Sequence, residues 1–114
     1  RYDEAFVGMK NCYPAQKTGR DISGHHLYVL RINFKKLGIS RGQLMQTLRA
    51  KQIGSQVHYI PVPAQPYYRN LGFKPEDYPN AQCYYLEALS IPLFYDLAEV
   101  QQQKIINVFK ELVG

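Results

Sequence analysis

The chain is short of cysteine, of acidic residues and of long apolar runs, and each shortage limits what the protein can be. No apolar run approaches the roughly 20 residues that a membrane-spanning helix needs, and residues 1–10 carry charges where a signal peptide would have its apolar core. The two cysteines, Cys12 and Cys83, lie far apart and form no CxxC motif. This usage favours free thiols in a reducing cytoplasm over a disulfide, and it predicts no metal site.

Motifs for self-contained catalysis are also missing. The sequence has no glycine-rich dinucleotide or phosphate loop and no HExxH motif, and no serine lies in a GxSxG elbow. Acidic residues are few, and no pair of carboxylates is spaced for acid–base chemistry. His25 and His26 open a predicted strand, where neighbours face opposite sides and cannot chelate one metal. The sequence therefore predicts no catalytic residue, cofactor-binding residue or metal ligand in this chain.

The charge balance is basic, with 14 Lys and Arg residues against 9 Asp and Glu residues and a formal net charge of +5. The basic residues are scattered along the chain, and Lys35–Lys36 is their sole adjacent pair. A surface that follows a phosphate backbone usually needs a clustered basic stripe. The distribution indicates that nucleic acid is not the partner.

The length of 114 residues suits one domain, and three segments favour β-strands. In residues 26–34 apolar side chains alternate with polar ones, which is typical of a strand with one face in the core. Residues 56–60 form the second predicted strand. Residues 90–94 form the third, where Pro92 indicates a sheet edge or a bulge. Residues 11–24 are polar and contain proline and glycine, which predicts a loop.

Helix signals lie between and after these strands. A capping box of Ser40 and Gln43 begins a helix that runs to near Gly54. A similar signal at Asp96 and Glu99 begins an amphipathic helix that continues to the end of the chain. The apolar stripe of that helix consists of Val100, Ile105, Val108, Phe109 and Leu112. Two further helical segments are the end of a helix over residues 1–7 and a helix over residues 81–89 capped by Asn80.

Together these elements predict an α+β fold: a small three-stranded, mainly antiparallel sheet covered by helices. The strand over residues 26–34 is expected to be central or nearly so. The helices that begin after Ser40 and Asp96 are expected on one face of the sheet. The last helix should then pack on Leu30 and Ile32.

The segment from Val57 to Phe94 is the most informative part of the chain. Three prolines, at positions 61, 63 and 66, stiffen it because each fixes its own φ and favours an extended predecessor. His58 and Tyr59 lie just before this stiff loop. Two interpretations remain open: His58 caps a backbone group while Tyr59 packs in the core, or His58 donates a hydrogen bond to a ligand. Tyr67 and Tyr68 are either structural or part of a wall on which a sugar ring stacks.

The order of motifs resembles a known family. The chain reads HLYVLRI, RGQLMQTLRAKQIG, QVHYIPVPAQPYYRNLGF, DYPNAQCYYLEALSIPLF and a final amphipathic helix. This order is similar to the C-terminal part of the nucleotide-sugar aminotransferases of the DegT/StrS type, pyridoxal-phosphate enzymes of fold type I. The resemblance covers about the whole chain. It is closest to the transaminases that make the 4-amino-4,6-dideoxy sugars of flagellin, polysaccharide and spore-coat glycans.

The resemblance implies that residues 1–114 are the C-terminal small domain of an aminotransferase, with the large cofactor-binding domain outside this chain. In the family the large domain holds pyridoxal phosphate on a lysine, and two subunits complete each other's active sites. The expected reaction transfers an amino group, from glutamate, to a nucleotide-linked 4-keto-6-deoxy sugar. The parent is expected to be a cytoplasmic homodimer, and this fragment alone is expected to be inactive and to bind no cofactor.

The residue-by-residue match is limited to the stiff loop and its start. His58 and Tyr59 match the family's HY motif, and Gln65, Tyr67 and Tyr68 match its QPYY motif together with the intervening proline. The resemblance implies that these five residues bind substrate. Pro63 stands where many relatives have a histidine, so a second imidazole at the sugar is not expected. The alternative function is a stand-alone, non-catalytic module for sugar or nucleotide binding or for structural interaction.

Overall fold

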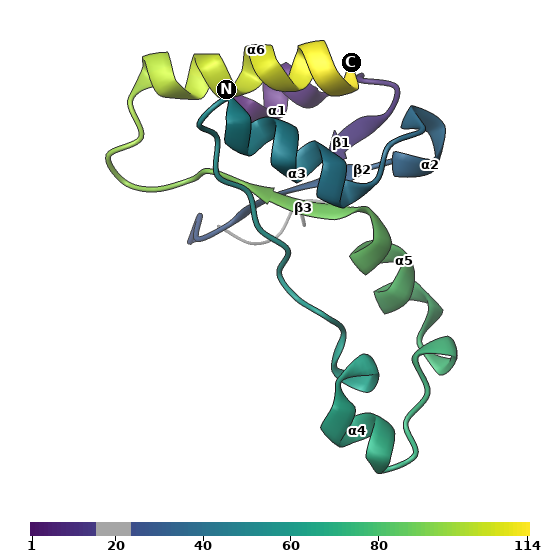
Figure 1. Ribbon diagram of the computed structural model, residues 1–114. Coiled ribbons are helices and arrows are strands. Elements are labelled where there is room, and N and C mark those ends of the chain that lie inside the picture. Colours follow the sequence, from purple (N-terminus) through teal and green to yellow (C-terminus); the bar gives the residue numbers. More distant parts are fainter. Residues whose placement is uncertain (16–23) are drawn as a thin grey trace.

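The computed structural model describes residues 1–15 and 24–114, and an antiparallel sheet lies at its centre. Within these residues the sheet has three strands, β1 (Cys12–Pro14), β2 (Tyr28–Ile32) and β3 (Ala88–Ile91), in the order β1-β2-β3. In the register of the β2–β3 pair, Leu30 lies opposite Leu89. The α+β class and the central position of the strand around Leu30 are confirmed (Figure 1).

Helices lie on both sides of this sheet. α1, α3 and α6 gather on one side, whereas α5 and α4 extend away from the other side (Figure 1). Among the described residues, none of the helices combines the length and the apolar character needed to cross a membrane. The helices are α1 (Tyr2–Phe6), α2 (Phe34–Leu37), α3 (Arg41–Ala50), α4 (Pro66–Asn70), α5 (Pro79–Glu87) and α6 (Glu99–Val113), with the 3-10 turns η1 (Val62–Ala64) and η2 (Pro75–Asp77).

The hydrophobic core lies between the sheet and the group of α1, α3 and α6. Leu30 and Ile32 of β2 are fully buried and belong to one cluster with Ile105 and Phe109 of α6. This is the packing that the apolar stripe predicts. Val100 is an exception, because 82% of it is exposed in the first turn of α6. The buried stripe therefore starts at Ile105.

One predicted strand and part of one predicted loop are wrong. The predicted strand over residues 56–60 is reduced to an isolated bridge between Gln56 and Ser90, because the chain then leaves the edge of β3. The third strand comes instead from Cys12–Pro14, inside the predicted loop. Pro14 is tolerated there because β1 is an edge strand, where a missing N–H need not break the ladder. Residues 16–23 of that predicted loop lie outside the described residues.

One predicted helix start is confirmed and two are wrong. At α3, Gln43 N–H donates to Ser40 Oγ at 3.1 Å, and Ser40 N–H donates to Gln43 Oε1 at 2.8 Å. Asn80 is not a cap, because α5 already begins at Pro79, whose fixed φ suits the first helical position. Asp96 is not a cap either, since α6 begins three residues later.

The start of α6 uses a glutamine in place of the expected aspartate. Ala98 is its N-cap residue, and the Ala98 N–H donates to Gln101 Oε1 at 3.0 Å. Upstream, β3 ends at Ile91, immediately before Pro92. The predicted strand over residues 90–94 is therefore displaced toward the N-terminus, because a proline cannot continue the ladder.

Residues 61–78 form an arm that leaves the body of the molecule and returns through α5 (Figure 1). Every residue of the arm is at least partly exposed. The radius of gyration is 15.3 Å, against about 13 Å for a compact domain of this length. The arm therefore adds surface to the fold and no core.

Two arginines fasten the end of α5 to the body. Arg31 of β2 forms an ion pair with Glu87 at 2.7 Å. Arg41, at the start of α3, donates to the carbonyl oxygens of Tyr85 and Ala88, the latter at 3.3 Å. A cation at the carbonyl end of a helix also complements the helix dipole. The base of the arm is thus fixed, and the arm extends from a rigid point.

Candidate functional site

A groove of about 1080 Å³ lies where the segment before β2, the segment after α3, strand β3 and the start of α6 meet. Its polar lining includes the imidazoles of His25, His26 and His58 and the ammonium group of Lys104. Glutamine amides and serine hydroxyls also line the groove, together with apolar side chains that include Phe94. None of the lining residues that the structure describes is an aspartate or glutamate. The groove therefore offers hydrogen-bond donors and positive charge to a ligand.

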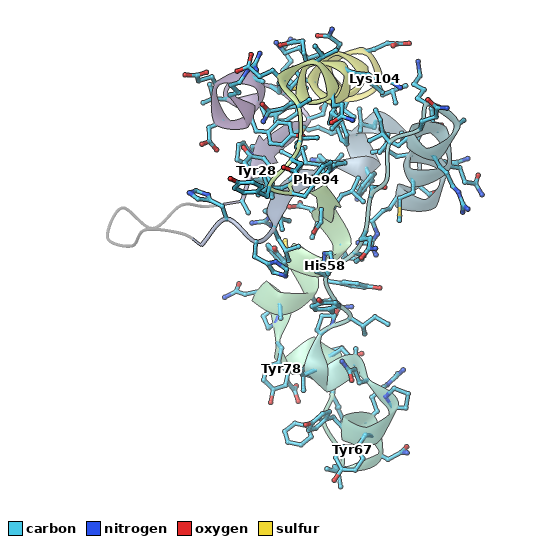
Figure 2. All side chains as sticks on the ribbon, turned by 90° about the vertical axis from the view of Figure 1, so that its left-hand side faces the viewer. Tyr28, His58, Tyr67, Tyr78, Phe94 and Lys104 are labelled. Carbon is cyan, nitrogen blue, oxygen red and sulfur yellow. The ribbon has the colours of Figure 1, made fainter. Side chains whose placement is uncertain are left out.

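His58 lies at one end of this groove, where the arm begins. Figure 2 shows His58 below Phe94, with Lys104 on the opposite side of Phe94, on α6. The bridge between Gln56 and Ser90, with backbone bonds of 2.8 and 3.1 Å, holds this segment against β3. It brings His58 Nδ1 within 2.8 Å of Ser90 Oγ. The half-buried imidazole is therefore held in place by a side-chain bond and does not cap a backbone group.

Tyr59 does not pack in the core. Its side chain is 70% exposed, and its ring meets the ring of His58 edge to face at a centroid distance of 4.7 Å. The peptide bond between the two residues is cis. The interpretation of Tyr59 as a core residue is wrong. The tyrosine presents its ring at the surface beside the imidazole.

The other three predicted site residues lie on the arm. Gln65 precedes α4 and its Nε2 contacts the Ile60 carbonyl oxygen at 3.4 Å. Tyr67 is 67% exposed, and its ring lies edge to face with that of Tyr68 at 5.1 Å. Figure 2 shows His58 near the middle of the molecule and Tyr67 at its lower end. Of the five predicted residues, His58 lines the groove, whereas Tyr59, Gln65, Tyr67 and Tyr68 do not.

Ser90 and Lys104 are members of the groove that sequence reasoning missed. Ser90 begins the strand predicted over residues 90–94, and no spacing rule links it to a histidine 32 positions earlier. A small polar residue inside the apolar run ALSIPL is a signal that could have identified it, because a buried hydroxyl requires a partner. Lys104 lies on the exposed side of an amphipathic helix, where lysines are common.

A second polar cluster, on the face of the sheet away from α6, is structural. Arg31 is held by Glu87 and lies 5.5 Å from the ring centroid of Tyr13. Burial is the largest single influence and acts to lower the pKa of Arg31, but the interactions with Glu87, Tyr13 and Cys83 together outweigh burial and the pKa is raised. Tyr13 donates to the same carboxylate at 3.3 Å. These contacts join β1, β2 and α5 and leave no charge free for chemistry.

The groove does not fit pyridoxal phosphate. That cofactor is held by a lysine and by a carboxylate or arginine beside its ring nitrogen. The described lining includes one lysine, Lys104, which is exposed, and neither a carboxylate nor an arginine. The described residues therefore suit a ligand that accepts hydrogen bonds, and they do not suit this cofactor.

Comparison with known proteins gives matches along nearly the whole chain. The sequence model of the DegT/DnrJ/EryC1/StrS aminotransferase family matches residues 1–110. The spore coat polysaccharide biosynthesis protein SpsC of Bacillus subtilis (strain 168) is 38% identical over 90 residues, which are 77% of this chain and 23% of that protein.

Solved structures agree with this result. The putative sugar aminotransferase Spr1654 from Streptococcus pneumoniae, in its PLP form, has a TM-score of 0.85 and 34% identity, over 98% of this chain and 28% of that chain. Helicobacter pylori PseC, an aminotransferase involved in the biosynthesis of pseudoaminic acid, has a TM-score of 0.84 at 24% identity over 98% of this chain and 30% of that chain, and shares the fold. The chain thus spans between a quarter and a third of the length of these solved relatives.

Proposed function

The chain belongs to the DegT/DnrJ/EryC1/StrS aminotransferase family, and we propose that it is the C-terminal small domain of a sugar aminotransferase. The support is the family match over residues 1–110 and the likeness to Spr1654. The matched part is 28% of the Spr1654 chain. In this proposal a large domain outside residues 1–114 holds pyridoxal phosphate, which supplies the electron sink for amino transfer. The small domain positions the sugar and excludes water.

The proposed reaction moves an amino group from glutamate to a nucleotide-linked 4-keto-6-deoxy sugar. The observation that supports a substrate role for this chain most strongly is His58, an imidazole bonded to Ser90 at one end of a groove that carries several hydrogen-bond donors. A keto sugar and its phosphates carry oxygen acceptors and negative charge. Such a ligand is complementary to imidazoles, amides and an ammonium group without opposing carboxylates.

The proposed substrate-binding residues are His58, Tyr59, Gln65, Tyr67 and Tyr68. They occupy two places, the base of the arm and its end, and His58 is the one of the five that lines the groove. In the proposal the cleft is completed by the large domain and by a second subunit of a homodimer. The exposed apolar side chains of the arm support this, because a monomer rarely leaves such a surface uncovered. They include Val62, Tyr67, Leu71, Phe73 and Tyr78.

The cellular compartment and the alternative function are separate questions from the reaction. Cytoplasmic localisation stays a prediction from the cysteine usage. The rival function is a stand-alone, non-catalytic binding module. It differs from the proposal in one simple respect, which is whether the reading frame upstream of Arg1 encodes a lysine-bearing cofactor domain.

The direct experiment uses the protein encoded by the complete reading frame. It is incubated with glutamate and a set of nucleotide-linked keto sugars, and amino sugar is measured by mass spectrometry. The proposal expects amination of a 4-keto-6-deoxy sugar with formation of 2-oxoglutarate. A frame without an upstream domain, together with sugar-nucleotide binding and no amino transfer, would establish the rival.

A further inference from the structure

Strand β3 buries a hydroxyl group whose side-chain partner is an imidazole. Ser90 is 5% exposed, and its Oγ lies 2.8 Å from His58 Nδ1. In the part of the chain that the structure describes, the hydroxyl makes no other side-chain hydrogen bond. A buried donor left without an acceptor costs about 1–3 kcal/mol. The arrangement that avoids this cost is one in which Ser90 donates its proton to Nδ1.

That bond determines where His58 carries its own proton. A neutral imidazole has one N–H, so a ring nitrogen that accepts a hydrogen bond leaves the proton on the other nitrogen. With Nδ1 accepting from Ser90, the N–H is at Nε2. Within residues 1–15 and 24–114, Nε2 has no hydrogen-bond partner. The ring lines the groove, so this N–H is available to a ligand.

The ring is also fixed in orientation. The Gln56–Ser90 bridge positions the backbone two residues before His58. The ring of Tyr59 contacts the imidazole edge to face at 4.7 Å. Strand alternation turns Leu89 and Ile91 toward the core, so the side chain of Ser90 projects from the opposite face, where it meets His58. Ser90 and the ring of Tyr59 thus contact the imidazole, and the bridge fixes the backbone beside it.

We propose that Ser90 is a positioning residue, which holds His58 as the neutral tautomer with its N–H at Nε2 and presents that N–H to an acceptor oxygen of the keto sugar. The role toward the sugar rests on the proposed function. The tautomer itself depends on the fold alone. The two parts can therefore fail separately.

The first experiment reads the tautomer directly. The chain is labelled with ¹⁵N-histidine, and spectra that correlate ring protons with ring nitrogens are recorded about two pH units above the ordinary histidine pKa of about 6.5. His58→Gln identifies the signals. The wild-type chain should show a protonated Nε2 and an unprotonated Nδ1. Ser90→Ala should give averaged signals of two tautomers, and Ser90→Thr should restore the wild-type pattern.

A matched control is available in Ser55, a half-buried serine that also lines the groove. Ser55→Ala is the same chemical change without loss of a bond to His58, and it should leave the His58 signals unchanged. A protonated Nδ1 in the wild-type chain would overturn the inference. So would an unchanged His58 spectrum in Ser90→Ala.

The second experiment uses the full-length enzyme and follows the amino-donor and sugar half-reactions separately. Ser90→Ala should slow the sugar half-reaction by about 5- to 10-fold, the value of one well-placed hydrogen bond, and Ser90→Thr should recover the rate. The donor half-reaction and the absorbance of bound cofactor should not change. If the tautomer depends on Ser90 but His58→Gln leaves the sugar half-reaction intact, the positioning by Ser90 stands and the proposed substrate site is wrong. If His58→Gln slows the sugar half-reaction and Ser90→Ala does not, the positioning role is wrong.

Discussion

At the scale of single residues, tyrosine hydroxyls fasten α1 to the sheet. Tyr2 donates to the carbonyl oxygen of Pro92 at 2.9 Å, and Tyr28 donates to Asp3 Oδ1 at 2.8 Å. Burial raises the pKa of Tyr2 to about 12, and burial followed by the bond to Asp3 raises the pKa of Tyr28. Burial also raises the pKa of the Cys12 thiol to about 12. The folded state thus retains three protons that the unfolded chain releases at lower pH.

These shifts predict a loss of stability in alkali. Each group contributes fully below its unfolded pKa, about 9.0 for Cys12 and 10.0 for the tyrosines, and its contribution is lost as pH rises toward the folded value. Above its unfolded pKa each group removes about 1.4 kcal/mol per pH unit from the free energy of unfolding. Urea titrations from about pH 8 to about pH 11 measure this loss. The Tyr2→Phe variant should be less stable than wild type at neutral pH, and its free energy of unfolding should fall less steeply as the pH rises. A free energy of unfolding that does not change across this range would show that these groups are not buried as described.

At the scale of elements, α6 is the helix whose face matters most. Ile105 is 4% exposed and Phe109 is fully buried. Ile105→Ala or Phe109→Ala should lower the free energy of unfolding by about 2–5 kcal/mol, as core truncations do. Val100→Ala, on the same helix but 82% exposed, should change it by less than about 0.5 kcal/mol. Thermal and urea melts of the three variants test the orientation of the helix. Equal losses of unfolding free energy in Val100→Ala and Phe109→Ala would show that α6 does not pack on the sheet with the face described.

Elements with local signals could be predicted from the sequence. The capping box at Ser40 and Gln43 is local, and so is the alternation in residues 26–34, because each depends on neighbours within a few positions. Strand β1 could not be predicted in this way. Its three residues form a strand because Cys12 pairs with Ile32, a contact that no short window contains.

The same limit applies to the candidate site. His58 could be singled out because it precedes a proline-stiffened loop and matches a family motif. Its partner Ser90 could not, because the bridge at Gln56 that joins them forms between residues 34 positions apart. Tyr59 shows the opposite error. An aromatic ring at the end of a predicted strand favours burial, but the chain leaves the sheet at that point and the ring of Tyr59 is exposed.

At the scale of the whole molecule, the arm is an exposed surface attached to a stable body. Leu71 on the arm is 61% exposed, whereas Leu89 in β3 is fully buried. In the isolated chain, Leu71→Ser should change the free energy of unfolding by less than about 0.5 kcal/mol, while Leu89→Ala should lower it by about 2–5 kcal/mol. In the full-length protein Leu71→Ser should weaken the proposed dimer, which sedimentation velocity measures. A dimer of undiminished strength would show that the arm does not contact the second subunit.

The chain by itself is expected to bind no pyridoxal phosphate and to transfer no amino group. The reason is that its groove lacks, among the described residues, a carboxylate or arginine for the ring nitrogen. The absorption spectrum of the chain mixed with the cofactor should equal the sum of the separate spectra. A stoichiometric band that borohydride traps at one lysine would contradict this expectation and would assign cofactor chemistry to the small domain.

The proposed substrate site depends most on His58 as a contact to the sugar. The measurement that tests it most directly is transient kinetics of both half-reactions in full-length enzyme carrying His58→Ala. The sugar half-reaction should slow by the equivalent of about 1–3 kcal/mol, the loss of one buried hydrogen bond. The glutamate half-reaction and the cofactor absorbance should stay at wild-type values, and the melting temperature should fall modestly because Ser90 loses its acceptor. If both half-reactions fall together with the melting temperature, His58 serves the fold and the account of the site is contradicted.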